Sequence, residues 1–103
     1  MIDNSDIINE ITTHILSYGG VYSRWYCGIT DDSRKRLFTD HKVSENQGIY
    51  IARKAQDKAA AEMIVKYFLD KGCQGTTEEG NASSRMVYAF LITSFTKQEL
   101  VEE

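Results

Sequence analysis

Apolar side chains recur every three to four residues in two segments of this chain. Residues 5–18 carry the stripe of an amphipathic helix, at Ile7, Ile8, Ile11, Ile15 and Leu16. Gly19 and Gly20 follow and predict its end, because glycine readily adopts the left-handed conformation of a helix stop. Residues 56–71 show the same period, at Ala59, Ala60, Met63, Ile64, Tyr67 and Phe68. Gly72 follows that second stripe as its stop.

Three shorter segments are rich in β-branched and aromatic residues. Residues 21–29 predict a strand that begins near Arg24, and residues 48–52 predict a short extended segment. Residues 86–92 are apolar almost throughout. Such a run predicts a strand that is buried on both faces or central in its sheet.

A short helix is expected directly after the first strand. Asp31 or Asp32 can cap its N-terminus, and the helix runs to about Thr39. Leu37 and Phe38 supply its buried side. The predicted order is therefore helix, strand, helix, extended segment, helix, strand.

Helices between the strands, in place of hairpins, indicate a small α+β fold. We expect a single domain over residues 1–103, with a short sheet from residues 24–30 and 86–92 covered by about three helices. Residues 72–84 form a long polar loop with three glycines. Residues 74–84 of this loop are expected to be mobile, because they contain no apolar anchor.

Composition narrows the classes of protein. With 42% apolar and 26% charged residues, the chain is typical of a soluble globular protein. No apolar run reaches the roughly 18 residues that span a bilayer, and the acidic N-terminus lacks the basic start of a signal peptide. We therefore expect no membrane partner and a cytoplasmic location. Cys27 and Cys73 have no metal-type spacing, and a cytoplasmic chain would keep them reduced.

The net charge of −3 argues against a protein that mainly coats nucleic acid with positive charge. Basic residues nevertheless gather in the first half of the chain, at Arg24, Arg34, Lys35, Arg36 and Lys42. They form either a local basic patch for a nucleic-acid partner or a solvated helix face.

The segment from Trp25 to His41 is the one whose pattern indicates a functional site. It resembles the second half of the signature of the GIY-YIG nuclease family, in which a tyrosine strand leads into a helix with an Arg-Leu pair and then a histidine. The matching residues are Tyr26, Cys27 and Gly28 on the strand, Arg36 and Leu37 on the helix, and His41 after it. His41 follows Arg36 by five residues, one more than is usual in that family.

Two later residues extend the resemblance. Glu62 resembles the metal-binding glutamate of the family, and Asn81 is a weak match to a later asparagine. The resemblance implies metal-dependent phosphodiester cleavage, with Mg²⁺ at Glu62 and catalytic roles for the site tyrosine, the arginine and the histidine. Such residue types suit the chemistry, because a guanidinium stabilises charge on phosphate and one carboxylate with waters is an ordinary Mg²⁺ environment.

The first strand of the family, Gly-Ile-Tyr, has no clear counterpart. It normally pairs with the second tyrosine strand as a hairpin, but only three residues separate Tyr22 from Tyr26. Two alternatives stay open. Either Tyr22 takes the place of the missing tyrosine, or the last strand, which carries Tyr88, pairs with the Tyr26 strand. The literal Gly-Ile-Tyr at residues 48–50 lies on the wrong side of that strand and is interpreted as coincidence.

Each candidate also has a plain structural interpretation. Tyr26 can be a packed strand aromatic, Arg36 a surface charge, and Glu62 a solvent-facing helix residue. The leading function is a divergent GIY-YIG-like protein that engages DNA or RNA, with metal-dependent endonuclease activity as its enzymatic form. The alternative is a non-catalytic binding module for a nucleotide-like ligand or a protein partner.

Overall fold

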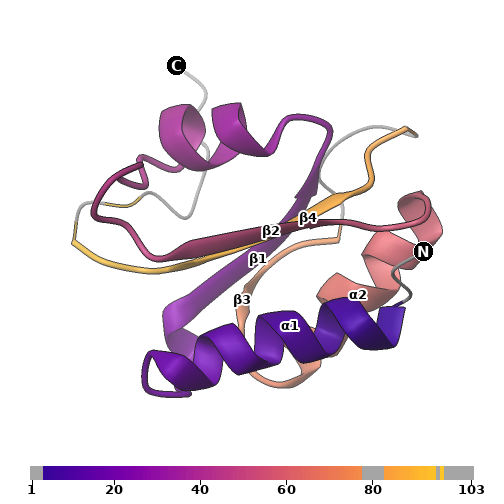
Figure 1. Cartoon of the computed structure of the whole chain (residues 1–103), viewed down its shortest axis with the longest axis horizontal. Helices are drawn as coiled ribbons and strands as arrows, with labels where there is room; N and C mark the ends of the chain where they lie inside the picture. Colours follow the sequence, from indigo (N-terminus) through magenta and orange to yellow (C-terminus); the bar gives the residue numbers. More distant parts are fainter. Residues whose placement is uncertain (1–3, 78–82, 95, 97–103) are drawn as a thin grey trace.

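The computed structural model of this protein describes residues 4–77, 83–94 and 96, and it has the α+β fold class that the sequence predicts (Figure 1). The elements in chain order are α1 (Asn4–Ser17), the 3₁₀ turn η1 (Tyr22–Arg24), β1 (Trp25–Thr30), the π-helix η2 (Lys35–Asp40), β2 (Tyr50–Lys54), α2 (Lys58–Asp70), β3 (Gln74–Gly75) and β4 (Met86–Leu91).

The four strands form one mixed sheet in the order β2-β4-β1-β3. The last strand, β4, lies in the middle and pairs antiparallel with both β1 and β2. Its predicted central position is therefore confirmed. So is the alternative in which β4 pairs with the Tyr26 strand, because Tyr26 faces Phe90 and Gly28 faces Tyr88 in the register.

Side chains alternate between the two faces of the sheet, as the strand period of two requires. On one face, α1 and α2 pack on Trp25, Cys27 and Ile29 of β1, and on Val87 and Ala89 of β4. On the other face, Tyr26, Tyr88 and Phe90 pack with Leu37 of η2 and with Val43. The sheet thus separates an aliphatic core beneath two long helices from a smaller, aromatic core beneath η2.

The predicted stripe of the second helix is partly wrong. The buried residues of α2 are Ala60, Ala61, Ile64, Val65 and Phe68. Met63 and Tyr67 are 67% and 37% exposed. Apolar residues extend over more than half of this helix, so the period alone fits two neighbouring faces. Packing against α1 and the sheet selects the face that presents the small Ala61 and the β-branched Val65.

The strand β3 is absent from the sequence prediction, which places a loop there. Its two residues pair parallel with Tyr26 and Cys27. Gly75 has φ +132°, and an added Cβ would lie 1.9 Å from the Cys27 carbonyl oxygen, so this close approach requires glycine. The predicted mobile loop, residues 74–84, therefore begins in the sheet. Residues 78–82 of it, and most of the tail after residue 94, lie outside the described residues.

Candidate functional site

Three aromatic rings and one imidazole form the centre of the aromatic core. The Tyr26 ring lies 4.7 Å from the His41 ring and 5.3 Å from Phe90, and it stacks on Tyr88 at 6.3 Å between centroids. Tyr26 and Tyr88 come from adjacent strands, and His41 follows η2. The structure therefore brings together two of the predicted site residues, Tyr26 and His41, and adds Tyr88.

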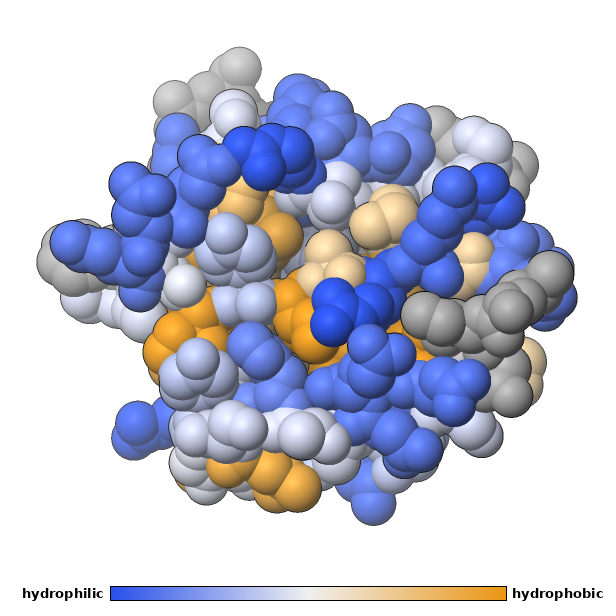
Figure 2. Space-filling view, in the orientation of Figure 1, coloured by the Kyte–Doolittle hydropathy of each residue, from blue (hydrophilic) through white to orange (hydrophobic). Residues whose placement is uncertain are grey.

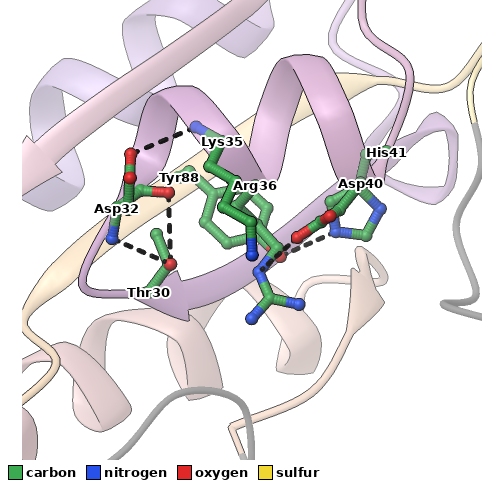
Figure 3. A network of polar contacts seen from close by, with 7 residues as sticks. All are labelled: Thr30, Asp32, Lys35, Arg36, Asp40, His41 and Tyr88. Atoms are coloured by element: carbon green, nitrogen blue, oxygen red, sulfur yellow. Dashed lines mark hydrogen bonds and ion pairs between the residues drawn. The ribbon is translucent and has the colours of Figure 1, made fainter.

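The polar contact of this cluster joins His41 to Tyr88. The His41 Nε2 atom lies 2.9 Å from the Tyr88 hydroxyl, and both side chains are fully buried (Figure 3). The Tyr88 hydroxyl and the His41 imidazole form a hydrogen bond with each other. This bond offsets the free-energy cost of burying either polar group alone. A buried, satisfied polar pair fixes the orientation of the rings around it.

The π-helix explains how His41 reaches this position. The His41 N–H donates to the Arg36 carbonyl at 2.9 Å, a bond that spans five residues. This wider turn ends with His41 next to the rings of Tyr26 and Tyr88. The expected cap is also present, since Asp32 Oδ1 accepts from the Lys35 N–H at 3.1 Å. η2 buries Leu37 of the two predicted core residues, and Phe38 is half-buried.

Arg36 lies on the same short helix, and its side chain is 20% exposed. Its Nε atom lies 3.7 Å from Asp40 Oδ2, a loose pair one helical turn along (Figure 3). η2 packs on the sheet face that holds Tyr26, so Arg36 and Tyr26 share one layer of the molecule. β3 pairs with β1 at Tyr26 and Cys27. Among the described residues, no strand pairs with that edge of β1 along residues 28–30.

Two predicted site residues do not join the cluster. Tyr22 lies in η1 and packs against the aliphatic core, on the opposite face from Tyr26. Glu62 is exposed on α2, a helix that also packs on that opposite face. Asn81, the weakest match, lies outside the described residues.

Mg²⁺ at Glu62 stays a prediction. Among the described residues, no group of three or more His, Cys, Asp or Glu side chains could hold a metal ion. The aromatic cluster contributes rings, an imidazole and phenols, whereas Mg²⁺ prefers carboxylates and waters. Asp40, a carboxylate near Arg36, is an ion-pair partner of Arg36. Glu62 lies on a helix that packs on the opposite face of the sheet from the aromatic cluster, and no step below passes through a metal.

A groove along β2 was not predicted from the sequence. It has a volume of about 400 Å³ and lies between η2, β2 and α1, with lining residues that include His14, Arg34, Phe38, Tyr50 and Arg53. Figure 2 shows this side of the molecule hollowed, with apolar side chains in the hollow and hydrophilic ones around it. Phe38 and Tyr50 meet edge to face at 5.0 Å, and the Arg34 guanidinium lies over Phe38. No local sequence pattern joins these residues, because they come from three separate elements.

The outer edge of β2 is closed by side chains. Arg53 Nη1 donates to the Ala52 carbonyl at 2.8 Å, while its Nε donates to Glu10 of α1 at 2.9 Å. His14 hydrogen-bonds the Tyr50 backbone, and burial followed by the positive charge of Arg53 lowers the His14 pKa. These contacts occupy the backbone acceptors that another strand would use, which protects the edge from pairing. His14 is thus half-buried and has a structural role.

No family model, curated protein or solved structure matches this chain. Among the described residues, no helix is both long and apolar enough to cross a bilayer.

Proposed function

We propose that this chain is a divergent GIY-YIG-like protein that engages DNA or RNA through Arg36 and Tyr26. The observation that carries the proposal is the antiparallel pairing of β1 with β4, which sets Tyr88 opposite Gly28. In the family, the first strand pairs antiparallel with the second strand of the motif and places a tyrosine beside it. In this proposal β4 takes the place of that strand, and Tyr88, in preference to Tyr22, takes the place of its tyrosine.

The residues of the cluster differ in burial, and we assign them different roles on that basis. His41 and Tyr88 are fully buried, so they act as positioning residues that hold Tyr26 and η2. The Arg36 side chain is 20% exposed, so it can reach a phosphodiester at the surface, and Tyr26, at 8%, is the least buried ring of the cluster. A guanidinium donates two parallel hydrogen bonds to a phosphate, a stronger arrangement than the loose contact with Asp40.

Cleavage of the bound phosphodiester is the finer part of the proposal. Arg36 would stabilise the negative charge that develops on the phosphoryl oxygens. The Tyr26 hydroxyl would orient the attacking water or pass its proton on. The family resemblance assigns Mg²⁺ binding to Glu62, but α2 packs on the opposite face of the sheet from Tyr26, so the role of Glu62 in cleavage is tested separately by its substitution.

The test measures binding and cleavage of labelled DNA and RNA oligonucleotides with and without Mg²⁺. Arg36→Ala is expected to weaken binding about tenfold or more, because a charge-assisted hydrogen bond is lost. Lys35→Ala is the matched control, since it removes the same charge from the exposed neighbouring residue of η2. Equal losses in both variants would contradict a specific role for Arg36.

Glu62→Gln tests the catalytic part, because it keeps the shape of the side chain and removes its charge. If the chain is an endonuclease, this variant loses Mg²⁺-dependent cleavage while its circular dichroism spectrum is unchanged. Asp70→Asn, a similarly exposed carboxylate on α2, should leave cleavage intact. Wild-type protein with neither cleavage nor measurable affinity for nucleic acid would overturn the proposal.

The second candidate is a non-catalytic module that binds a nucleotide-like ligand, and the β2 groove favours it. The groove combines the aromatic rings of Phe38 and Tyr50 with the cations Arg34 and Arg53, a combination suited to a base and a phosphate. Both cations are paired, with Glu45 and Glu10 respectively, so a phosphate must displace a carboxylate. Nucleotide binding that Arg53→Ala abolishes and Arg36→Ala leaves unchanged would support this candidate over the first.

A further inference from the structure

The two cysteines, 46 positions apart in the sequence, lie together in the fold. Cys27 is on β1 and fully buried, and Cys73 directly precedes β3 and is 7% exposed. Both side chains belong to the aliphatic core, on the same face of the sheet. Cys73 is next to Gln74, which pairs with Tyr26, the neighbour of Cys27, so the two cysteines lie on adjacent paired segments. The mutual influence of the two thiols on their pKa values fits this proximity.

The backbone holds the two cysteines in place from both sides. β3 pairs parallel with β1, so that Gln74 faces Tyr26 and Gly75 faces Cys27. The close approach at Gly75 leaves no room for a side chain between the two strands. On the other side, the Cys73 N–H donates to the Phe68 carbonyl at the end of α2, at 3.0 Å. The thiols therefore meet between two fixed segments, where an encounter costs little chain entropy.

We propose that Cys27 and Cys73 form a redox-active thiol pair that peroxide converts to a reversible intramolecular disulfide. The pair has no competing assignment as a metal site, because no group of three or more metal-ligating side chains exists among the described residues. The inference stands on the placement of both cysteines in one buried cluster on adjacent paired segments and does not depend on the proposed function.

The two cysteines have different chemical roles. The hydrogen bond from Cys27 lowers the Cys73 pKa, whereas the hydrogen bond to Cys73, together with burial, raises the Cys27 pKa. Cys73 is also the thiol with some solvent exposure, so it supplies the attacking thiolate. Cys27 resolves the intermediate from inside the core.

The reaction balances with hydrogen peroxide as the oxidant. The Cys73 thiolate attacks one peroxide oxygen, the O–O bond breaks, and the departing hydroxide takes up the Cys73 proton to form water. The Cys27 sulfur then attacks the sulfenic sulfur of Cys73. The S–O bond breaks, the hydroxyl leaves as a second water with the Cys27 proton, and the S–S bond forms. Two electrons pass from the two thiols to one peroxide.

The experiment treats folded wild-type protein with hydrogen peroxide, denatures it, and alkylates the remaining thiols before measuring the intact mass. The expected product is a monomer without alkyl groups and about 2 Da lighter than the reduced chain, restored by a thiol reductant. Two alkylated thiols after treatment, or a disulfide-linked dimer as the main product, would overturn the proposal. This measurement needs no variant, so a folding defect cannot obscure it.

Single variants then assign the roles. In Cys27→Ala, Cys73 should accumulate as a sulfenic acid that dimedone traps, because the resolving thiol is missing. In Cys73→Ala, the buried Cys27 should stay reduced in the folded protein and react only after denaturation. If Cys27 in that variant is oxidised as fast as Cys73 in the other, the assignment of Cys73 as the attacking thiol is wrong.

Discussion

The two faces of the sheet are built from alternate residues of the same strands, yet they differ in kind. The face beneath α1 and α2 buries mostly aliphatic side chains, from the isoleucines of α1 to Val87 and Ala89 of β4. The face beneath η2 buries the rings of Tyr26, Tyr88 and Phe90 around a histidine. The first face is held mainly by apolar area, whereas the second also depends on the directional hydrogen bond between His41 and Tyr88. A change of volume should therefore damage the first face, and a change of a single atom the second.

Ile64→Ala should give the largest loss, because Ile64 is fully buried between α2 and the sheet. Truncation of such a residue leaves a cavity and costs about 2–5 kcal/mol of unfolding free energy. Met63→Ala, its neighbour on the exposed side of α2, should change stability by less than about 0.5 kcal/mol. Urea denaturation of both variants measures the difference. Similar losses would show that α2 packs through the face that the sequence stripe predicts.

Tyr88→Phe should cost about 1–3 kcal/mol, although it removes a single oxygen atom, because the buried Nε2 of His41 loses its partner. The double variant Tyr88→Phe/His41→Leu removes both polar groups and should recover part of that loss. Tyr50→Phe is the control, since it removes an exposed hydroxyl that donates to the Glu45 carbonyl. A strictly additive double variant would indicate that the His41–Tyr88 bond contributes nothing.

Loss of a helix cap should give the smallest change in unfolding free energy. The change should be larger for α2 than for η2. Asp57→Ala removes the acceptor for the Ala60 N–H at the start of α2 and should cost about 1 kcal/mol. Asp32→Ala removes the corresponding acceptor at η2. It should cost less, because Leu37 is the one fully buried residue of that short helix. A larger loss from Asp32→Ala would place η2, and not α2, in the cooperative core.

The elements that the sequence predicts well are those whose signals are local. The isoleucine period of α1, the Asp32 cap and the apolar run of β4 each determine one element directly. The α+β class follows from their order. The stripe of α2 could not be assigned, because apolar residues cover most of that helix and only tertiary packing chooses among them. β3 has no apolar sequence pattern, because it consists of Gln74 and Gly75, which pair with β1 through their backbone.

The candidate site was predictable only in part, for a related reason. Tyr26, Arg36 and His41 lie in one continuous segment, so a motif can identify them. Tyr88 comes 47 residues after His41, and its place depends on strand order, which a local pattern does not encode. The same applies to the pair of Cys27 and Cys73. That Tyr22 and Glu62 lie on the other face follows from the direction of a turn and a helix, which no spacing in the sequence specifies.

The central position of the last strand has a consequence for how the protein is made. β1 and β2 do not touch each other in the sheet, because β4 lies between them. While the ribosome synthesises the chain, β1 and β2 emerge long before their shared neighbour, and water binds the main-chain groups that β4 will later pair. Completion of the sheet therefore follows release of residues 86–91, a late, long-range step of the kind that slows folding. Until then β1 and β2 each expose the edge that β4 covers, which a chaperone can bind and which can aggregate.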